Sequence, residues 1–133
     1  MTLVDTSIIV AWLDPTHPDH LACSQALDDR AASDDLALSS VTFAELAAGG
    51  RNRDALDEDL REFERIDLRF DAAFRAGQAF ARYRPGKRDP KLVLPDFLIR
   101  GQAAVMGVPH LTNDRRRTRA FPEVEFIFPT AKG

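Results

Sequence analysis

The chain has 133 residues, 44% hydrophobic and 29% charged, a balance typical of soluble globular proteins, so we expect residues 1–133 to form a single domain. A net charge of −3 excludes binding of polyanions through overall charge, although a local basic patch could still bind phosphates. The lone cysteine, Cys23, excludes an intrachain disulfide and fits a reducing compartment. Neither a signal peptide nor a membrane span is visible, so we expect a cytoplasmic protein without membrane contacts.

Short apolar runs and helical patterns alternate through the first half of the chain. In order, they predict a strand over 2–4, helices over 6–13 and 20–32, a strand over 36–38, and helices over 41–49 and 53–64. The first helix rests on the spacing of Ile8 and Trp12, four residues apart, and the third is expected to end at Gly49 and Gly50.

The second half continues the alternation. In order, the sequence predicts a strand over 66–68, a helix over 71–84, a loop over 84–95, a helix over 96–107, a strand over 110–112, a turn or short helix over 113–121 and a strand over 124–128. In the helix over 71–84, Ala73, Ala76, Gly77 and Phe80 are expected to share one face. The whole pattern favours an α/β fold, with a mostly parallel sheet of about five short strands flanked by helices.

Four acidic residues stand beside apolar segments of this predicted sheet. Asp5 ends the first strand, Glu45 lies in the helix after the second, and Asp114 follows the strand over 110–112. Asp96 begins the helix that leads into that strand. Because ligands of open α/β sheets bind beyond the carboxyl ends of the strands, these four carboxylates could meet at one edge.

Each acid also has an ordinary structural interpretation. Asp5 could cap the first helix, and Asp96 suits the positive end of a helix dipole. Glu45 stands three residues after Thr42, the spacing of a capping box, and Asp114 could be a turn residue. The joint pattern favours a site, because isolated capping residues have no reason to gather on one side of a sheet.

A cluster of four carboxylates needs a counter-charge or a shared proton. Two carboxylates about 4 Å apart repel by roughly 4 kcal/mol at an effective dielectric constant near 20. Oxygen ligands favour Mg²⁺ or Mn²⁺ over zinc, and no set of histidines and cysteines competes for the role. Such an ion is suited to phosphoryl chemistry, because it activates water and neutralises charge on the phosphate.

The ordered motifs resemble those of PIN-domain nucleases, specifically the VapC-type ribonuclease toxins of toxin–antitoxin pairs. The resemblance covers nearly the whole chain and rests on "LVDTSIIVAWL", "SSVTFAELAAG", "LPDFLIRGQAAVMGVPHLTNDRRR" and "FPEVEFIFP". It implies a PIN-like three-layer fold and a metal-dependent endoribonuclease that hydrolyses RNA phosphodiester bonds. It also implies a homodimer that is neutralised by a cognate VapB-like antitoxin.

The resemblance also implies roles for individual residues. Asp5 and Asp96 would be the principal ligands of Mg²⁺ or Mn²⁺, and Glu45 and Asp114 would complete the catalytic and metal site. The hydroxyls that would support this pocket belong to Ser7 and Thr112. The sequence departs from many relatives at three positions, which bear on substrate contacts and not on the acids: Gln102, Asn113 and Ala120.

Other interpretations remain open. The basic run after the last acid could bind RNA phosphates or form a solvated turn, and its candidate residues are Arg115, Arg116 and Arg117. A catalytically inactive PIN-like module that binds RNA or protein is the main alternative function. A phosphatase with Asp5 as nucleophile is disfavoured, because such enzymes usually carry a second Asp where Ser7 stands. The absence of a glycine-rich first turn argues against a nucleotide-binding loop.

Overall fold

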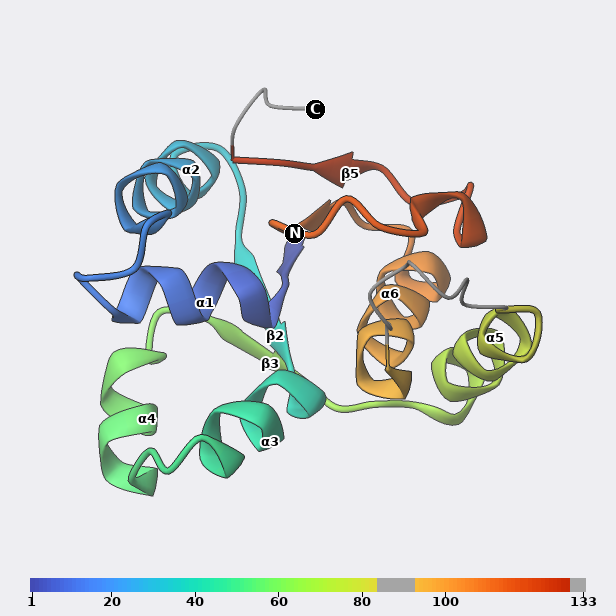
Figure 1. The fold of residues 1–133 in the computed structure, drawn as a ribbon, viewed down its shortest axis with the longest axis horizontal. Helices are drawn as coiled ribbons and strands as arrows, with labels where there is room; N and C mark the ends of the chain where they lie inside the picture. The colour runs from blue at the N-terminus through green and yellow to red at the C-terminus, as the bar shows by residue number, and fades with distance from the viewer. Residues whose placement is uncertain (84–92, 130–133) are drawn as a thin grey trace.

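The computed structural model describes residues 1–83 and 93–129 (Figure 1). Its strands are β1 (Thr2–Val4), β2 (Leu36–Ser39), β3 (Glu64–Ile66), β4 (His110–Leu111) and β5 (Phe126–Ile127). Its helices are α1 (Thr6–Leu13), α2 (His20–Ala31), α3 (Ser40–Ala48), α4 (Arg53–Asp59), α5 (Phe70–Ala81), α6 (Leu94–Met106) and the 3₁₀ turn η1 (Thr118–Ala120). The predicted loop over 84–95 lies mostly outside the described residues, and its last two residues begin α6.

The five strands form one sheet in the order β3-β2-β1-β4-β5, and every neighbouring pair is parallel. The central strand β1 pairs with β2 on one side and with β4 on the other, where Leu3 faces His110 and Val4 faces Leu111. The predicted α/β fold with a parallel sheet of short strands is therefore confirmed.

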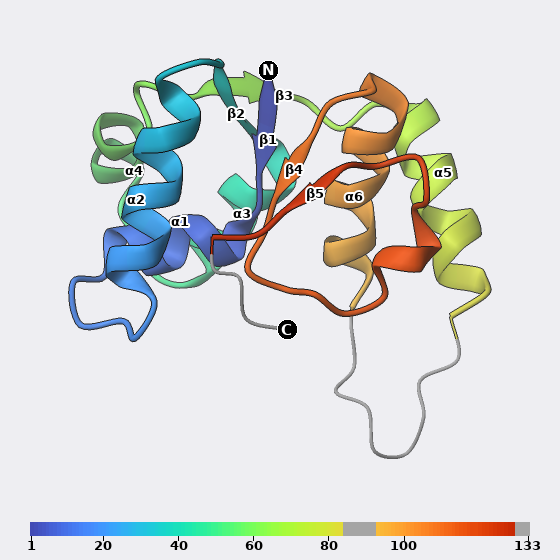
Figure 2. The same ribbon diagram turned by 90° about the horizontal axis from the view of Figure 1, so that it is seen from above.

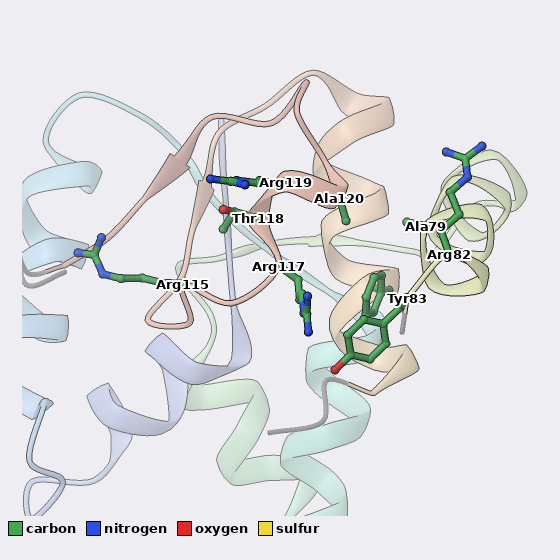
Figure 3. A pocket seen from close by; sticks show the side chains of 9 residues that line it. Ala79, Arg82, Tyr83, Arg115, Arg117, Thr118, Arg119 and Ala120 are labelled. Carbon is green, nitrogen blue, oxygen red and sulfur yellow. The ribbon is translucent and has the colours of Figure 1, made fainter. Parts of the chain in front are cut away.

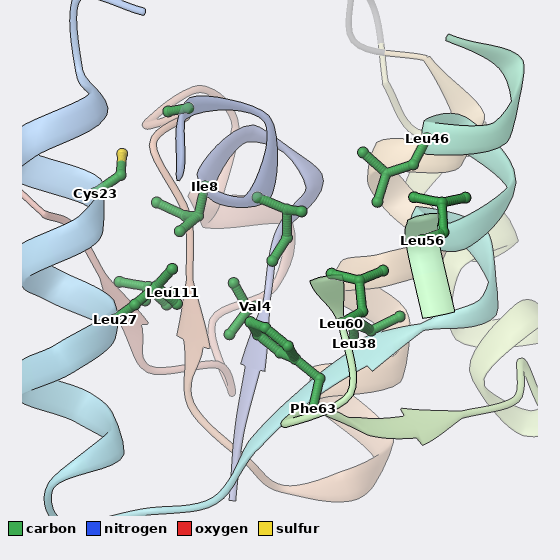
Figure 4. Packing of buried hydrophobic residues seen from close by; sticks show 12 residues of the cluster. Val4, Ile8, Cys23, Leu27, Leu38, Leu46, Leu56, Leu60, Phe63 and Leu111 are labelled. Atoms are coloured by element: carbon green, nitrogen blue, oxygen red, sulfur yellow. The ribbon is translucent and has the colours of Figure 1, made fainter. Parts of the chain in front are cut away.

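Helices cover both faces of this sheet (Figures 1 and 2). Successive residues of a strand point to opposite faces, so Val4 and Leu38 enter one core while Leu3 and Ala37 enter the other. The first core is completed by side chains from α1 to α4, including Ile8 (Figure 4). The second core packs against α5 and α6. This arrangement places the helix that follows β1 and the helix that precedes β4 on opposite faces, with their acids near one edge.

Several predicted boundaries shift. The third strand spans Glu64–Ile66 and not 66–68, and α4 ends at Asp59 although helical spacing continues to Phe63. Leu60 and Phe63 are nonetheless buried, at 0% and 8% exposure, because the turn after α4 still faces the core. The last strand is limited to two residues, and the expected β-strand pairing of Val124 is absent although its side chain is buried.

The buried face of α5 shares only Ala76 with the predicted face. The buried residues are Ala72, Ala76 and Ala79, whereas Phe80 is 37% exposed and Gly77 is exposed. Alanines face α6 because the two helices approach closely: a Cβ atom on Gly101 of α6 would lie 2.7 Å from the Ala72 carbonyl oxygen.

Candidate functional site

The four predicted acids come from four separate parts of the fold. Asp5 joins β1 to α1, and Glu45 lies in α3 directly after β2. Asp96 lies in the first turn of α6, and Asp114 lies in the loop that follows β4. Parallel pairing of β2, β1 and β4 brings the first, second and fourth of these positions to the same sheet edge.

The charges of these acids act on one another. Burial, and then the negative charges of Asp96 and Asp5, raise the pKa of Glu45 above its usual value, against a hydrogen bond that lowers it. The pKa of Asp96 is also raised, first by burial and further by the charges of Asp5 and Asp114. The fold thus gathers four like charges within electrostatic reach, which is unfavourable unless a cation shares the space.

Asp5 is the most buried of the four, at 9% exposure. Its Oδ2 accepts hydrogen bonds from the hydroxyls of Ser7 (2.6 Å) and Thr112 (3.2 Å), and from the Ser7 backbone N–H. The Nε2 atom of His110 lies 3.5 Å from Oδ1. Burial alone would raise the pKa of Asp5, but His110 and these hydrogen bonds lower it far below the usual range, so Asp5 is held as a carboxylate.

The two hydroxyl residues also tie Asp5 to the loop after β4. The Asn113 backbone N–H donates to the Ser7 hydroxyl (3.0 Å), and the Asp114 backbone N–H donates to the Thr112 hydroxyl (3.1 Å). Ser7 and Thr112 therefore contact both Asp5 and the segment that carries Asp114. Asp5 also caps α1, so its ordinary structural role and its place among the acids coexist.

Glu45 does not form the capping box that its spacing from Thr42 suggested. The cap of α3 is Ser39, whose hydroxyl accepts from the Val41 N–H. The Glu45 carboxylate instead accepts a hydrogen bond from the Thr6 hydroxyl at 2.7 Å. Thr6 was missed by sequence reasoning, although it stands inside the motif "DTS" between two residues that were singled out.

The Asp114 carboxylate is bound by a residue of its own loop. The Arg116 side chain donates to both carboxylate oxygens, from Nε to Oδ1 (2.9 Å) and from Nη2 to Oδ2 (2.7 Å). Although burial acts to raise its pKa, the bonds to Arg116 leave the pKa of Asp114 below its usual value. Of the three predicted RNA-binding arginines, Arg116 contacts an acid, whereas Arg115 and Arg117 lie over the rings of Phe128 and Tyr83.

A second arginine, Arg100, lies close to the acids and was also missed by sequence reasoning. Arg100, four residues after Asp96 in α6, is only 3% exposed. Its guanidinium donates to the backbone carbonyls of Asp114 (3.0 Å) and Arg116 (2.5 Å), and it lies over the ring of Phe126. Burial lowers the pKa of Arg100, and the charges of Asp114, Asp5 and Asp96 oppose that change. A charged residue inside the apolar run "FLIRGQAAV" was the available signal.

The donor set fits a hard divalent cation, because all four groups are carboxylates and two of them resist ionisation beside the others. Within residues 1–83 and 93–129, no three His, Cys, Asp or Glu side chains are already arranged as a metal site. In this structure the four carboxylates accept hydrogen bonds from Thr6, Ser7, Thr112, Arg116 and the Val93 backbone N–H. Binding an ion would therefore require side-chain rearrangement, above all release of Asp114 by Arg116.

Comparison with solved structures shows the same fold in toxin–antitoxin proteins. The chain is similar to a toxin–antitoxin complex from Klebsiella pneumoniae, with a TM-score of 0.74, 22% identity and 98% coverage of both chains. VapBC2 of Rickettsia felis, bound to a promoter DNA fragment, gives a TM-score of 0.71 and 23% identity over 96% of this chain and 97% of the other. Mycobacterium tuberculosis VapC20, a toxin that cleaves the sarcin–ricin loop, gives a TM-score of 0.66 and 17% identity over 94% of this chain and 99% of the other.

No curated protein sequence matches the chain. Among the described residues, no helix is long and apolar enough to cross a membrane. Residues 2–126, nearly the whole chain, match the PIN domain family. The protein, with its parallel sheet and its four acids from separate parts of the fold, belongs to the PIN domain family.

Proposed function

We propose that this protein is a metal-dependent endoribonuclease toxin that hydrolyses RNA phosphodiester bonds and is neutralised by a cognate antitoxin. PIN domains are a family of nucleases, which supports the general activity. The observation that carries the proposal is a group of four carboxylates from separate parts of the fold, in which burial first, and then the charges of neighbouring acids, raise the pKa of both Glu45 and Asp96. Such coupling opposes folding and is expected where a cation is to be bound.

Asp5 and Asp96 would be the principal ligands of Mg²⁺ or Mn²⁺, with Glu45 and Asp114 completing the site directly or through water. A bound dication lowers the pKa of an attacking water and neutralises charge on the scissile phosphate. The chain's own contribution is orientation: Ser7 and Thr112 hold Asp5, and Thr6 holds Glu45. Once Arg116 leaves Asp114, its guanidinium is available to an RNA phosphate.

The direct test compares Asp96→Asn with Asp71→Asn. Asp71 also lies in the first turn of a helix, but its side chain is exposed on α5. Asp96→Asn should reduce Mn²⁺-dependent cleavage of total cellular RNA by at least about a hundredfold, because it removes a metal ligand, and Asp71→Asn should cut normally. Circular dichroism checks that both variants fold. If Asp96→Asn cleaved RNA at the parent rate, Asp96 would not be a residue of the catalytic site.

The alternative is a PIN-like module that binds RNA or protein without cutting. The bidentate contact of Arg116 with Asp114 is the observation in its favour, since it neutralises one acid without a metal. The two functions differ in their response to cations. RNA that stays intact at every Mn²⁺ and Mg²⁺ concentration, while the protein still binds it, would favour the module.

We further propose that the antitoxin directs a basic side chain toward the acids. The solved neighbours include a toxin–antitoxin complex from Klebsiella pneumoniae and VapBC2 of Rickettsia felis, which supports an antitoxin partner. A pocket that attracts a dication also attracts Arg or Lys. A neutralising antitoxin should lose affinity when its basic residue is replaced by Gln, and Mn²⁺ should compete with the parent. Equal affinity of both antitoxins would contradict this arrangement.

We also propose a homodimer, as the resemblance implies, and assign α5 to its interface. Phe70 and Phe74 lie one helical turn apart and are 95% and 70% exposed. A two-fold axis would pair this stripe with itself and so remove both rings from water. Sedimentation should give a dimer for the parent and a monomer for Phe70→Ser/Phe74→Ser, whereas a monomeric parent would contradict the proposal.

A further inference from the structure

A cavity of about 460 Å³ lies between the end of α5, the start of α6 and the segment around η1 (Figure 3). Its lining residues are Ala79, Arg82, Tyr83, Phe97, Arg115, Arg117, Thr118, Arg119 and Ala120. Four of these are arginines, of which Arg117 points toward Tyr83 whereas Arg82 and Arg115 point away from it (Figure 3). Tyr83 and Phe97 supply aromatic rings whose centroids are 5.4 Å apart. The cavity thus combines positive charge with flat apolar surface.

This cavity shares a loop with the acidic cluster. Within residues 114–117, Asp114 and Arg116 bind each other, and Arg115 lies over the ring of Phe128. Arg117 is the residue of this loop whose side chain faces Tyr83. Arg117 has a φ of +55°, the only positive value among non-glycine residues in the described part of the chain. This costly backbone conformation accompanies a guanidinium that lies 5.1 Å from the centre of the Tyr83 ring. In Figure 3 the two side chains point toward each other.

These properties select a class of ligand. The guanidinium of Arg117, which lies over the Tyr83 ring, favours an anion at this place. The rings of Tyr83 and Phe97, with Ala79 and Ala120, favour a planar apolar group beside that anion. Its volume lies within the usual range for small-ligand sites. A nucleotide unit, which joins a planar base to a phosphate, meets all three conditions.

We propose that this cavity is a nucleotide subsite for single-stranded RNA, beside the acidic cluster. The base stacks on Tyr83, and Arg117 contacts the phosphate of the same nucleotide. The inference rests on the proposed ribonuclease function and deepens it, because it assigns a binding position next to the bond that is cut. Because stacking tolerates every base, we expect the subsite to bind unpaired RNA with little sequence preference.

The test measures binding without cleavage. A fluorescein-labelled single-stranded RNA of mixed sequence is titrated with the full chain in EDTA, and anisotropy gives the Kd. Tyr83→Leu should weaken binding about tenfold, since stacking on an aromatic residue supplies much of the affinity per base. Tyr83→Phe keeps the ring and should bind within about twofold of the parent. The leucine keeps apolar bulk against Phe80 and Phe97, and melting curves check folding.

Charge is tested separately. Arg117→Ala should weaken RNA binding and reduce the slope of log Kd against log salt concentration by about one, because one phosphate contact is lost. The matched control is Arg61→Ala, which removes an exposed arginine beside α4, at the opposite end of the molecule from α5 (Figure 1). Its affinity should change by less than about twofold and its salt slope should stay the same.

The outcomes separate this inference from the nuclease proposal. Equal affinities for Tyr83→Leu and Tyr83→Phe, or an unchanged salt slope for Arg117→Ala, would overturn the subsite even if the parent cuts RNA. Loss of RNA affinity in Tyr83→Leu would support the subsite even if no cation restores cleavage by the parent. If the cavity binds an acidic peptide instead, Tyr83→Leu should weaken binding of that peptide and leave binding of RNA unchanged. This result would also overturn the nucleotide subsite.

Discussion

A single buried cation connects the acidic cluster to the core. Arg100 is nearly inaccessible, and its described hydrogen bonds go to two carbonyl oxygens of the loop that carries Asp114. In a protein interior, removal of such a donor leaves buried acceptors unsatisfied, and here it also removes positive charge near Asp5 and Asp96. Arg100 therefore holds the loop in place and offsets the repulsion among the carboxylates.

Arg100→Met should lower the free energy of unfolding by about 3 kcal/mol in EDTA, as expected for a buried cation with satisfied hydrogen bonds. Urea denaturation measures the change. The control Arg61→Met removes an exposed arginine paired with Glu58 and should cost less than about 1 kcal/mol. Part of the loss in Arg100→Met should be recovered in Mn²⁺. Equal stabilities of the two variants would show that Arg100 is dispensable.

The predicted acids were accessible to sequence reasoning because each flanks an apolar segment in an ordered motif, and the fold brings their charges within reach of one another. The apolar neighbours of Arg100 indicate a buried arginine, but nothing local identifies its partners or those of Tyr83. Their environment is set by loops distant in sequence: the carbonyls of residues 114 and 116 for Arg100, and the guanidinium of Arg117 for Tyr83.

At the scale of elements, the close contact between α5 and α6 limits the size of the side chains that these helices can carry where they meet. Gly101→Ala would place a Cβ 2.7 Å from the Ala72 carbonyl oxygen and 2.9 Å from the Ala76 Cβ, so the helices must separate. We expect a loss of about 1–3 kcal/mol in unfolding free energy, measured by urea denaturation. Gly77→Ala on exposed α5 surface meets no atom within 4 Å and should instead be neutral or stabilising by up to about 1 kcal/mol. Equal effects of the two substitutions would contradict this packing.

The same contact explains why the buried face of α5 differs from the predicted face although its helix was correct. Hydrophobicity placed Phe80 inward, but the close approach at Gly101 admits only alanines there. Phe80 lies at the edge of this contact, where its half-exposed ring packs against Phe97. Helices and the parallel sheet follow from periodicity and alternation, which are local. The face that a helix buries depends on the size of its neighbour's side chains, which a single sequence does not reveal when both faces are apolar.

At the scale of the whole molecule, the acidic cluster links folding to pH and to metal. The pKa values of Glu45 and Asp96 are raised in the metal-free fold, so each carboxyl group holds its proton more tightly in the folded chain than in the unfolded chain. Their contribution to stability is therefore lost as pH rises through the raised values. Asp5 and Asp114, whose pKa values are lowered, contribute in the opposite direction, so the metal-free stability curve alone does not isolate the cluster.

At the proposed metal site, a dication would separate these contributions, because it would bind the ionised carboxylates and displace the protons held by Glu45 and Asp96. The rise in Tm caused by Mn²⁺ should therefore grow between about pH 4 and pH 7, with protons released on binding at the lower end. Thermal melts with Mn²⁺ or EDTA, and calorimetry in two buffers of different ionisation enthalpy, measure both effects. Asp96→Asn should reduce the Mn²⁺ effect at every pH, and Asp71→Asn should leave it intact. A Tm shift independent of pH, or unaffected by Asp96→Asn, would mean that the ion binds elsewhere and that the coupled carboxylates serve another purpose.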